Sequence, residues 1–197
     1  MSSTEYLPIT LVKEYYWCPL KAYYRLTIWR TRPTESMETG KQLQGMHRAR
    51  IIELLEKHHA IRETLWEHPV TSKRLGLAGR VDLVAITTKE TIIVLDMKLA
   101  PTTRKKLLTR DKHTAAQLAA YTVAAEETLR KPLETAYIYT IENQELVELK
   151  ITPMLRRLVE HAATQLHRIN QGHQPAPTPS RRKCATCEYN TICPHRR

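Results

Sequence analysis

The stretch GRVDLVAITTKETIIVLDMK, residues 79–98, decides the fold class of this chain. It covers most of two runs rich in Val, Ile and Leu, which extend over Leu77–Ile86 and Thr91–Leu99. The polar link Thr87–Glu90 separates the two runs. Short apolar runs with many β-branched residues, bounded by such a link, are typical of paired strands. The sequence therefore predicts a β-hairpin.

Charged residues interrupt both strands of this hairpin. Asp82 lies in the first strand, and Asp96 and Lys98 lie in the second. A charge in a buried strand costs free energy unless it is paired or bound to a metal. Side chains alternate along a strand, so Asp96 and Lys98 face the same way, and the hairpin can bring Asp82 to the same site. A structural salt bridge is one interpretation; the other is a Mg²⁺ or Mn²⁺ site in which Lys98 orients or deprotonates an attacking water.

Apolar periodicity and turn residues predict the remaining elements. The resulting order α–α–β–β–β–α–β–β–α predicts an α/β fold, with a central mixed sheet flanked by helices. Helices are expected over Ile9–Leu26 with a break at Cys18-Pro19, over Ser36–Ala60, over His113–Leu129 and from Pro153 onward, and the other strands are expected over Thr64–Ser72, Glu134–Glu142 and Glu145–Ile151.

Composition limits the class of protein. The 197 residues suffice for one ordinary domain with a sizeable core. Lys and Arg number 31 against 20 Asp and Glu, a net charge of +11 that favours polyanionic partners such as nucleic acid. No window is apolar enough for a membrane span, and no signal peptide is visible, so we expect a cytoplasmic protein without a membrane partner.

The four cysteines have the spacing of ligands. Cys184 and Cys187 form a C-x2-C pair, Cys193 follows closely, and Cys18 lies near the other end of the chain. Disulfides are rare in the cytosol, so four thiolates point to a tetrahedral zinc site or an iron–sulfur cluster. Spacing does not decide between the two. Either would join the first helix to the C-terminal tail, which follows a Pro-rich linker.

Further candidates lie on the helices and in a basic segment. His47, upstream of the strands, could point a metal ligand at the sheet. Gln117 and Tyr121 are four residues apart and share a helix face, where they could line a groove or be solvated. After Pro101 we expect a basic loop, which either contacts DNA phosphates or is a solvated surface. Its candidate DNA-binding residues are Arg104, Lys105, Lys106 and Arg110.

Taken together, these residues resemble the CRISPR-associated RecB-like exonucleases over almost the full length of the chain. The resemblance lies in the joint occurrence and order of short motifs, each modest by itself. The motifs are Tyr16-Trp17-Cys18-Pro19, His47 after Gly40 and Gly45, Gly79-x-x-Asp82, Asp96-x-Lys98, Gln117-x-x-x-Tyr121 and Cys184-x2-Cys187-x5-Cys193-Pro194. Two small departures are Asp96, where Glu is more usual, and Leu20, where a basic residue is expected after Pro19.

The resemblance implies a restriction-endonuclease-like, PD-(D/E)xK fold. It divides the chain into an N-terminal helical segment, residues 1–35, a RecB-like nuclease core, residues 36–170, and a linker with the cluster motif, residues 171–197. The four cysteines would hold an iron–sulfur cluster, with four irons favoured over two. His47, Asp82, Asp96 and the backbone carbonyl of Met97 would bind Mn²⁺ or Mg²⁺.

The activity implied is metal-dependent cleavage of single-stranded DNA from the 5′ end. It would process fragments for CRISPR spacer acquisition, with the CRISPR integrase complex as partner. Asp82, Asp96, Lys98, Gln117 and Tyr121 would be the catalytic residues. The alternatives are a nuclease of general DNA repair and a non-catalytic nucleic-acid-binding module with a zinc staple.

Overall fold

The strands form a single mixed sheet in the part of the chain that the structure describes. This computed structural model describes residues 6–28 and 35–197, with side chains from residue 45 onward in the second range. Strand order is β1-β3-β4-β5-β6, with β2 also paired to β3. The strands are β1 (Leu7–Pro8), β2 (Ile61–Ser72), β3 (Leu77–Thr87), β4 (Ile92–Lys98), β5 (Leu133–Thr140) and β6 (Glu145–Leu149).

The predicted hairpin is confirmed, because β3 and β4 pair antiparallel from Leu83 opposite Leu95 to Ile86 opposite Ile92. β5 runs parallel to β4 and antiparallel to β6, so the sheet is mixed, as expected. β1 was not predicted from the sequence. It has two residues, and its partners on β3 are about 70 positions away, which leaves no local pattern to detect.

The helices also follow the predicted order, with two short additions, α4 and α7. Cys18 has extended backbone angles between the first two helices, and Pro19 begins the second. Proline suits a first helical position because its missing N–H is not needed there, so the expected break is confirmed. The helices are α1 (Thr10–Trp17), α2 (Pro19–Thr27), α3 (Glu35–Glu56), α4 (Arg104–Thr109), α5 (Lys112–Leu129), α6 (Pro153–Asn170) and α7 (Arg181–Ala185).

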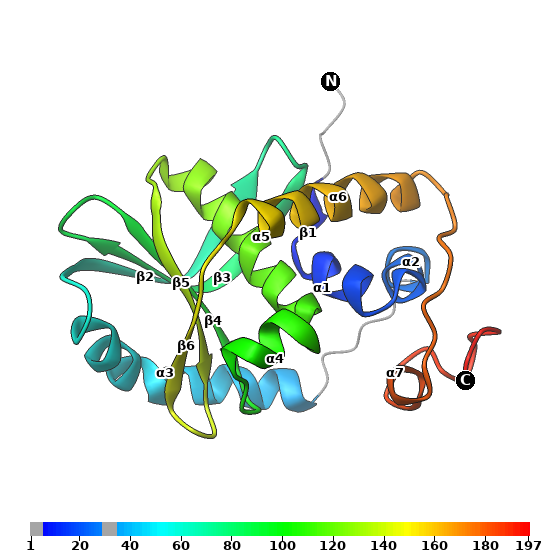
Figure 1. The fold of residues 1–197 in the computed structure, drawn as a ribbon, viewed down its shortest axis with the longest axis horizontal. Coiled ribbons are helices and arrows are strands. Elements are labelled where there is room, and N and C mark those ends of the chain that lie inside the picture. Colours follow the sequence, from blue (N-terminus) through cyan, green and yellow to red (C-terminus); the bar gives the residue numbers. More distant parts are fainter. Residues whose placement is uncertain (1–5, 29–34) are drawn as a thin grey trace.

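Helices cover both faces of the sheet (Figure 1). On one face, Val84 and Val94 belong to the main core, together with apolar side chains of α1, α5 and α6. On the other face, Leu83 and Leu95 pack with Ile51 and its neighbours on α3. Neighbouring residues of a strand thus point to opposite layers. Alternate residues of β4, counted from Val94, therefore face α5.

The central helix is α5, which lies between the sheet and the helices α1 and α6 (Figure 1). Twelve consecutive residues, Thr114–Ala125, are buried. A helix buried on all sides is apolar all round, and six of these positions are alanine, which lets neighbouring backbones approach closely. The helix predicted from Ala and Leu content is therefore also the one that the rest of the fold surrounds.

The C-terminal segment returns to the N-terminal helices. From the end of α6 the Pro-rich linker runs to α7 and the C-terminus, which lie beside α2 (Figure 1). Tyr189 packs against Leu20 and Tyr24 of α2 in a small apolar cluster of its own. Segments separated by more than 150 residues are thereby brought into contact.

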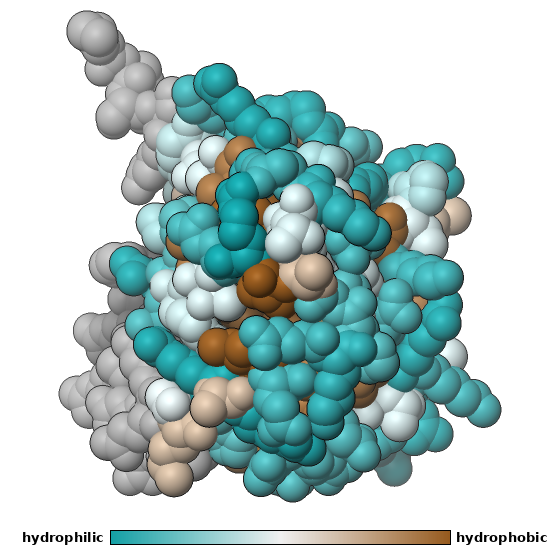
Figure 2. All heavy atoms as spheres, turned by 90° about the vertical axis from the view of Figure 1, so that its left-hand side faces the viewer, coloured by the Kyte–Doolittle hydropathy of each residue, from teal (hydrophilic) through white to brown (hydrophobic). Residues whose placement is uncertain are grey.

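The surface is predominantly polar where it is seen in Figure 2. Hydrophilic side chains cover most of that face, and the hydrophobic areas are small gaps between them (Figure 2). No helix among the described residues is both long and apolar enough to span a bilayer.

Gly76, in the turn between β2 and β3, provides a test of the fold. Its φ is +63°, and an added Cβ would lie 2.5 Å from Nε2 of His167, a ring atom that is hydrogen bonded to the Leu75 carbonyl. Gly76→Ala should lower the free energy of unfolding by about 1–3 kcal/mol in urea denaturation. The control Gly45→Ala lies in α3 with nothing within 4 Å and should raise stability by about 1 kcal/mol or less. Equal unfolding midpoints for both variants would show that the turn tolerates a side chain at position 76.

Candidate functional site

Two acids lie where the hairpin of β3 and β4 opens. The paired positions end at Leu83 and Leu95, and Asp82 and Asp96 occupy the next position of each strand. Oδ2 of Asp82 accepts a 2.6 Å hydrogen bond from the backbone N–H of Met97. Opposed positions on antiparallel strands direct their side chains to one face. The two carboxylates therefore share the face that α5 covers.

Asp96 is the more deeply buried of the two acids, with 8% of its surface exposed. Burial raises the pKa of its carboxyl, and the ammonium groups of Lys98 and Lys13 oppose this shift only in part. A cation would offset the cost of ionising such a group. Carboxylate and carbonyl oxygens are the donors that hard divalent ions prefer, so Asp82, Asp96 and the Met97 carbonyl fit Mg²⁺ or Mn²⁺ chemically.

Lys98 follows Asp96 by two residues and points to the same face of β4. Its pKa is lowered to about 8, because burial disfavours the ammonium more than the Asp96 carboxylate stabilises it, and the charge of Lys13 adds to the lowering. The side chain is still mostly charged at neutral pH but loses its proton more readily than a solvated lysine. It is therefore suited to donate to a phosphate oxygen or to transfer a proton.

The face of α5 that meets this site carries Gln117 and Tyr121. The Gln117 side chain is hydrogen bonded to the Tyr121 phenol, whose pKa burial raises, with further contributions from the carboxylates of Asp96 and Asp82. Tyr121 is thus a protonated donor. It can approach the sheet because Gly79 has no side chain: an added Cβ would lie 3.1 Å from the tyrosine ring. This contact gives a physical reason for glycine in the Gly79-x-x-Asp82 motif.

His47 is not brought together with the acids. It lies on α3, which packs on the opposite face of the sheet, and its Nδ1 is hydrogen bonded to the Tyr139 hydroxyl at 2.9 Å. Among the described side chains, no group of three or more His, Cys, Asp and Glu is placed to hold a metal ion. Metal binding by His47 therefore stays a prediction.

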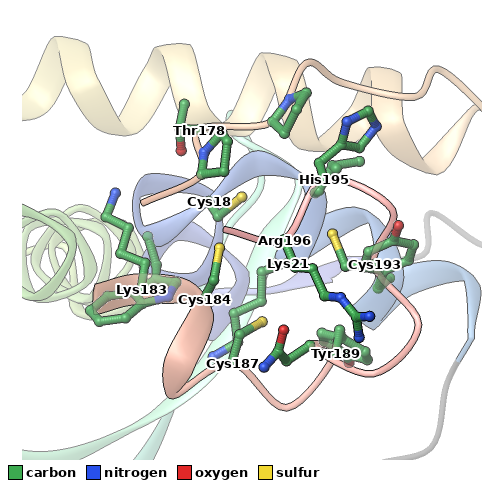
Figure 3. A pocket seen from close by; sticks show the side chains of 16 residues that line it. Cys18, Lys21, Thr178, Lys183, Cys184, Cys187, Tyr189, Cys193, His195 and Arg196 are labelled. Carbon is green, nitrogen blue, oxygen red and sulfur yellow. The ribbon is translucent and has the colours of Figure 1, made fainter. Parts of the chain in front are cut away.

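The four cysteines line one pocket between α2, α7 and the C-terminal tail (Figure 3). All four carry free thiols and are half-buried. Leu20, Tyr24 and Tyr189 form the apolar wall on which Cys18, Cys187 and Cys193 pack. Burial raises the pKa of the Cys187 thiol, and the nearby ammonium of Lys21 lowers it in part. Thiols are the donors that a thiophilic metal prefers, and metal binding would deprotonate them, but the four described thiols are not grouped as a metal site in this structure.

The basic segment is a helix rather than the expected loop. Arg104, Lys105 and Lys106 lie in α4, and Arg110 follows at its end, all exposed. The sequence interpretation missed two helix-forming features: the Thr103 side chain caps the first turn by accepting from the Lys106 backbone N–H, and Leu107 is buried. Contact of these residues with DNA stays a prediction.

Two residues near the site were not singled out from the sequence. The charge of Lys13, on α1, acts on both Asp96 and Lys98. His113 lies four residues before Gln117, and the charges of Lys13 and Lys98 act on it. The spacing of His113, Gln117 and Tyr121 could have revealed the histidine. Lys13 had no sequence signal, because its neighbours are about 85 residues away.

The sequence of this chain is similar to those of known nucleases. The sequence pattern of the PD-(D/E)XK nuclease superfamily matches residues 20–194. The chain is 34% identical over 188 residues to the CRISPR-associated exonuclease Cas4 of Aeropyrum pernix, which covers 94% of each chain. It is 28% identical to the protein of the same name from Thermoproteus tenax, over 94% of this chain and 92% of that one.

A solved structure shows a similar fold. The crystal structure of SSO0001 superimposes with a TM-score of 0.57 and 17% sequence identity, over 98% of this chain and 88% of that chain. At this identity the comparison concerns the fold alone. It agrees with the restriction-endonuclease-like α/β fold that the resemblance to the RecB-like exonucleases implied.

His113 should contribute to acid sensitivity. Its folded-state pKa is lowered from 6.5 to about 4, first by burial and then by Lys13 and Lys98. Between these values the unfolded chain binds a proton that the folded chain does not, so this histidine costs stability as the pH falls from 6.5 towards 4. His113→Gln should therefore lose less stability than the wild type between pH values of about 7 and 4.5, as measured by urea unfolding.

The control for this experiment is His173→Gln, which changes an exposed histidine of the linker. It should follow the wild-type pH dependence. A His113→Gln variant whose stability falls as steeply as that of the wild type would show that the imidazole is not held neutral.

Proposed function

Because the chain belongs to the PD-(D/E)XK nuclease superfamily and to its CRISPR-associated exonuclease Cas4 family, we propose that it is a Mg²⁺- or Mn²⁺-dependent exonuclease of single-stranded DNA. Family membership makes the chain a nuclease with a CRISPR-related role. The strand type, the 5′ to 3′ direction and the metal are the finer parts of the proposal. The observation that supports it most is the burial of Asp96 beside Asp82 and Lys98 on one face of the sheet.

Each residue near the acids has a chemical role in this proposal. A divalent ion bound by Asp82, Asp96 and the Met97 carbonyl would activate water and polarise the phosphodiester. Lys98 donates to the phosphate and stabilises the charge that develops during the attack. Tyr121 donates a hydrogen bond from its protonated phenol, and Gln117 fixes the direction of that donor.

Charge and exposure support a DNA substrate. The net charge is +11, and the exposed basic residues of α4 follow directly on the strand that carries Asp96 and Lys98. Contacts of Arg104, Lys105, Lys106 and Arg110 with backbone phosphates would hold a strand without reading its sequence. We propose that the products are fragments processed for spacer acquisition, with the CRISPR integrase complex as partner in the cytoplasm.

We further propose that the cysteine pocket holds an iron–sulfur cluster, a four-iron cluster rather than a two-iron one. The support is a set of four half-buried thiols on one apolar-walled pocket formed by both ends of the chain. Bound there, the cluster would supply the cross-link that joins α2 to the tail. Zinc is the alternative occupant for the same ligands.

Replacement of Asp96 by Asn should separate activity from stability. The variant should show no metal-dependent degradation of end-labelled single-stranded DNA. Its metal-free form should be more stable than the wild type at neutral pH, because the raised pKa means that ionised Asp96 destabilises the fold at pH values above its unfolded pKa. Urea unfolding measures this gain.

Metal binding can be measured on the same variant without an activity assay. Mn²⁺ should raise the melting temperature of the wild type and leave that of Asp96→Asn unchanged. Glu56→Gln, an exposed position at the end of α3, should behave as the wild type in both experiments. Full DNA degradation by Asp96→Asn would refute the proposed function.

Loss of one cysteine should empty the cysteine pocket. Anaerobically purified wild type should be brown, with thiolate-to-iron absorption, and Cys193→Ser should lose most of its iron per chain and melt at a lower temperature. Thr186→Ala, an exposed position inside the C-x2-C turn, should retain its iron. A colourless wild type with stoichiometric zinc would overturn the iron–sulfur assignment in favour of zinc.

A further inference from the structure

One face of α1 is turned towards the acidic site. Lys13 and Trp17 are four residues apart on this helix and therefore share a face. The Trp17 ring packs edge-on against the His113 ring, with centroids 5.0 Å apart. His113 lies on the first turn of α5, one turn before Gln117. This contact fixes the Lys13 face of α1 against the end of α5 that meets the site.

Lys13 lies within a small group of charges. Its ammonium acts on Asp96, Lys98 and His113, and it lies within side-chain hydrogen-bonding range of Lys98. Asp111 is also near, because its carboxylate acts on Lys98 and His113. Among the described residues, the ion pairs on this side of the molecule join Lys21 and Arg25 to Glu14 and Glu188 and do not include Lys13.

The balance of these charges points to an anionic ligand. If a divalent cation takes up the charges of Asp82 and Asp96, the described charges around Lys98 are its own ammonium, the Lys13 ammonium and the Asp111 carboxylate, while the Lys183 ammonium acts on His113. His113 is neutral at physiological pH, because its pKa is lowered to about 4. Two neighbouring ammonium groups repel each other, and one phosphodiester charge would balance the surplus.

We propose that Lys13 is a second phosphate-binding residue of the site, which holds a phosphodiester of the DNA strand adjacent to the bond that is cut. The proposal rests on the proposed nuclease function and extends it beyond the strands of the core to α1. In this proposal Lys13 contacts the substrate itself. Trp17 is a positioning residue, because its contact with His113 holds α1, and with it Lys13, against α5. The helix that delivers this ammonium ends at Trp17, the residue before the pocket cysteine Cys18.

Phosphate neutralisation tests this contact directly. A neutral methylphosphonate linkage is placed at one position at a time along a single-stranded oligonucleotide, and kcat/KM is measured with each. In the wild type, one position next to the cut should lower kcat/KM roughly tenfold or more, since a charge-assisted contact is lost. In Lys13→Ala the charged oligonucleotide should already show this loss, and neutralisation at that position should add nothing.

Matched variants separate a phosphate contact from a folding defect. Lys13→Arg keeps the charge and should retain the position-specific sensitivity. Lys73→Ala removes an exposed lysine in the turn between β2 and β3, so it changes the net charge equally and should keep the wild-type pattern. If Lys13→Ala does not fold, a wild-type pattern for Lys13→Gln, which keeps the length without the charge, would refute the contact.

The same oligonucleotides are also used in equilibrium binding with Ca²⁺, which takes the same oxygen donors, in place of Mg²⁺ or Mn²⁺. This measurement separates the two proposals. A wild type that binds the oligonucleotides but never cleaves them would refute the nuclease proposal. The contact of Lys13 would then be tested by the position-specific loss of affinity in Lys13→Ala. If the wild type cleaves and Lys13→Ala shows the same sensitivity as the wild type at every neutralised position, the role of Lys13 is refuted and the nuclease proposal stands.

Discussion

Asp96 lies near the end of the largely apolar strand β4 and is buried against α5. The arrangement of the groups around it follows from the free-energy cost of burying a carboxylate. A carboxylate with a raised pKa destabilises the fold unless a cation accompanies it. The opposed Asp82, the partly desolvated Lys98 and the Tyr121 phenol all lie around this group. Gly79 lets the tyrosine ring approach closely, since an added Cβ would make a tight 3.1 Å contact with it. The buried carboxylate thus lowers the stability of the metal-free fold and at the same time provides a binding site for a cation.

The two ends of the chain cooperate in a second region. α2 and the C-terminal tail form the pocket of four cysteines, and its flanking residues reach towards the acids. Lys183, beside Cys184, lies over the Trp17 ring at 5.9 Å, and Trp17 also packs edge-on against His113 of α5. These contacts join the cysteine pocket to the first turn of α5 through Lys183 and Trp17.

The opposite face of the sheet is fastened differently, by two histidine–tyrosine pairs. His47 is hydrogen bonded to Tyr139, and His59 contacts Tyr137 through Nε2 at 2.9 Å and the Glu134 carboxylate through Nδ1 at 2.7 Å. The two tyrosines are two residues apart on β5 and so share a face. Together the two pairs hold α3 and the segment after it against the sheet. In the first pair, Nδ1 of His47 is the ring nitrogen that is hydrogen bonded to Tyr139.

The sequence by itself determined the hairpin, the mixed sheet and the family motifs, because alternation, turn residues and short spacings are local patterns. It placed Asp82 and Asp96 on one face for the same reason, since strand geometry alone decides which way a side chain points. Only the tertiary structure added Lys13 to the site and placed His47 on the other face. Those positions depend on how α1 and α3 pack against the sheet, and packing between segments distant in the chain leaves no periodic signal in the sequence.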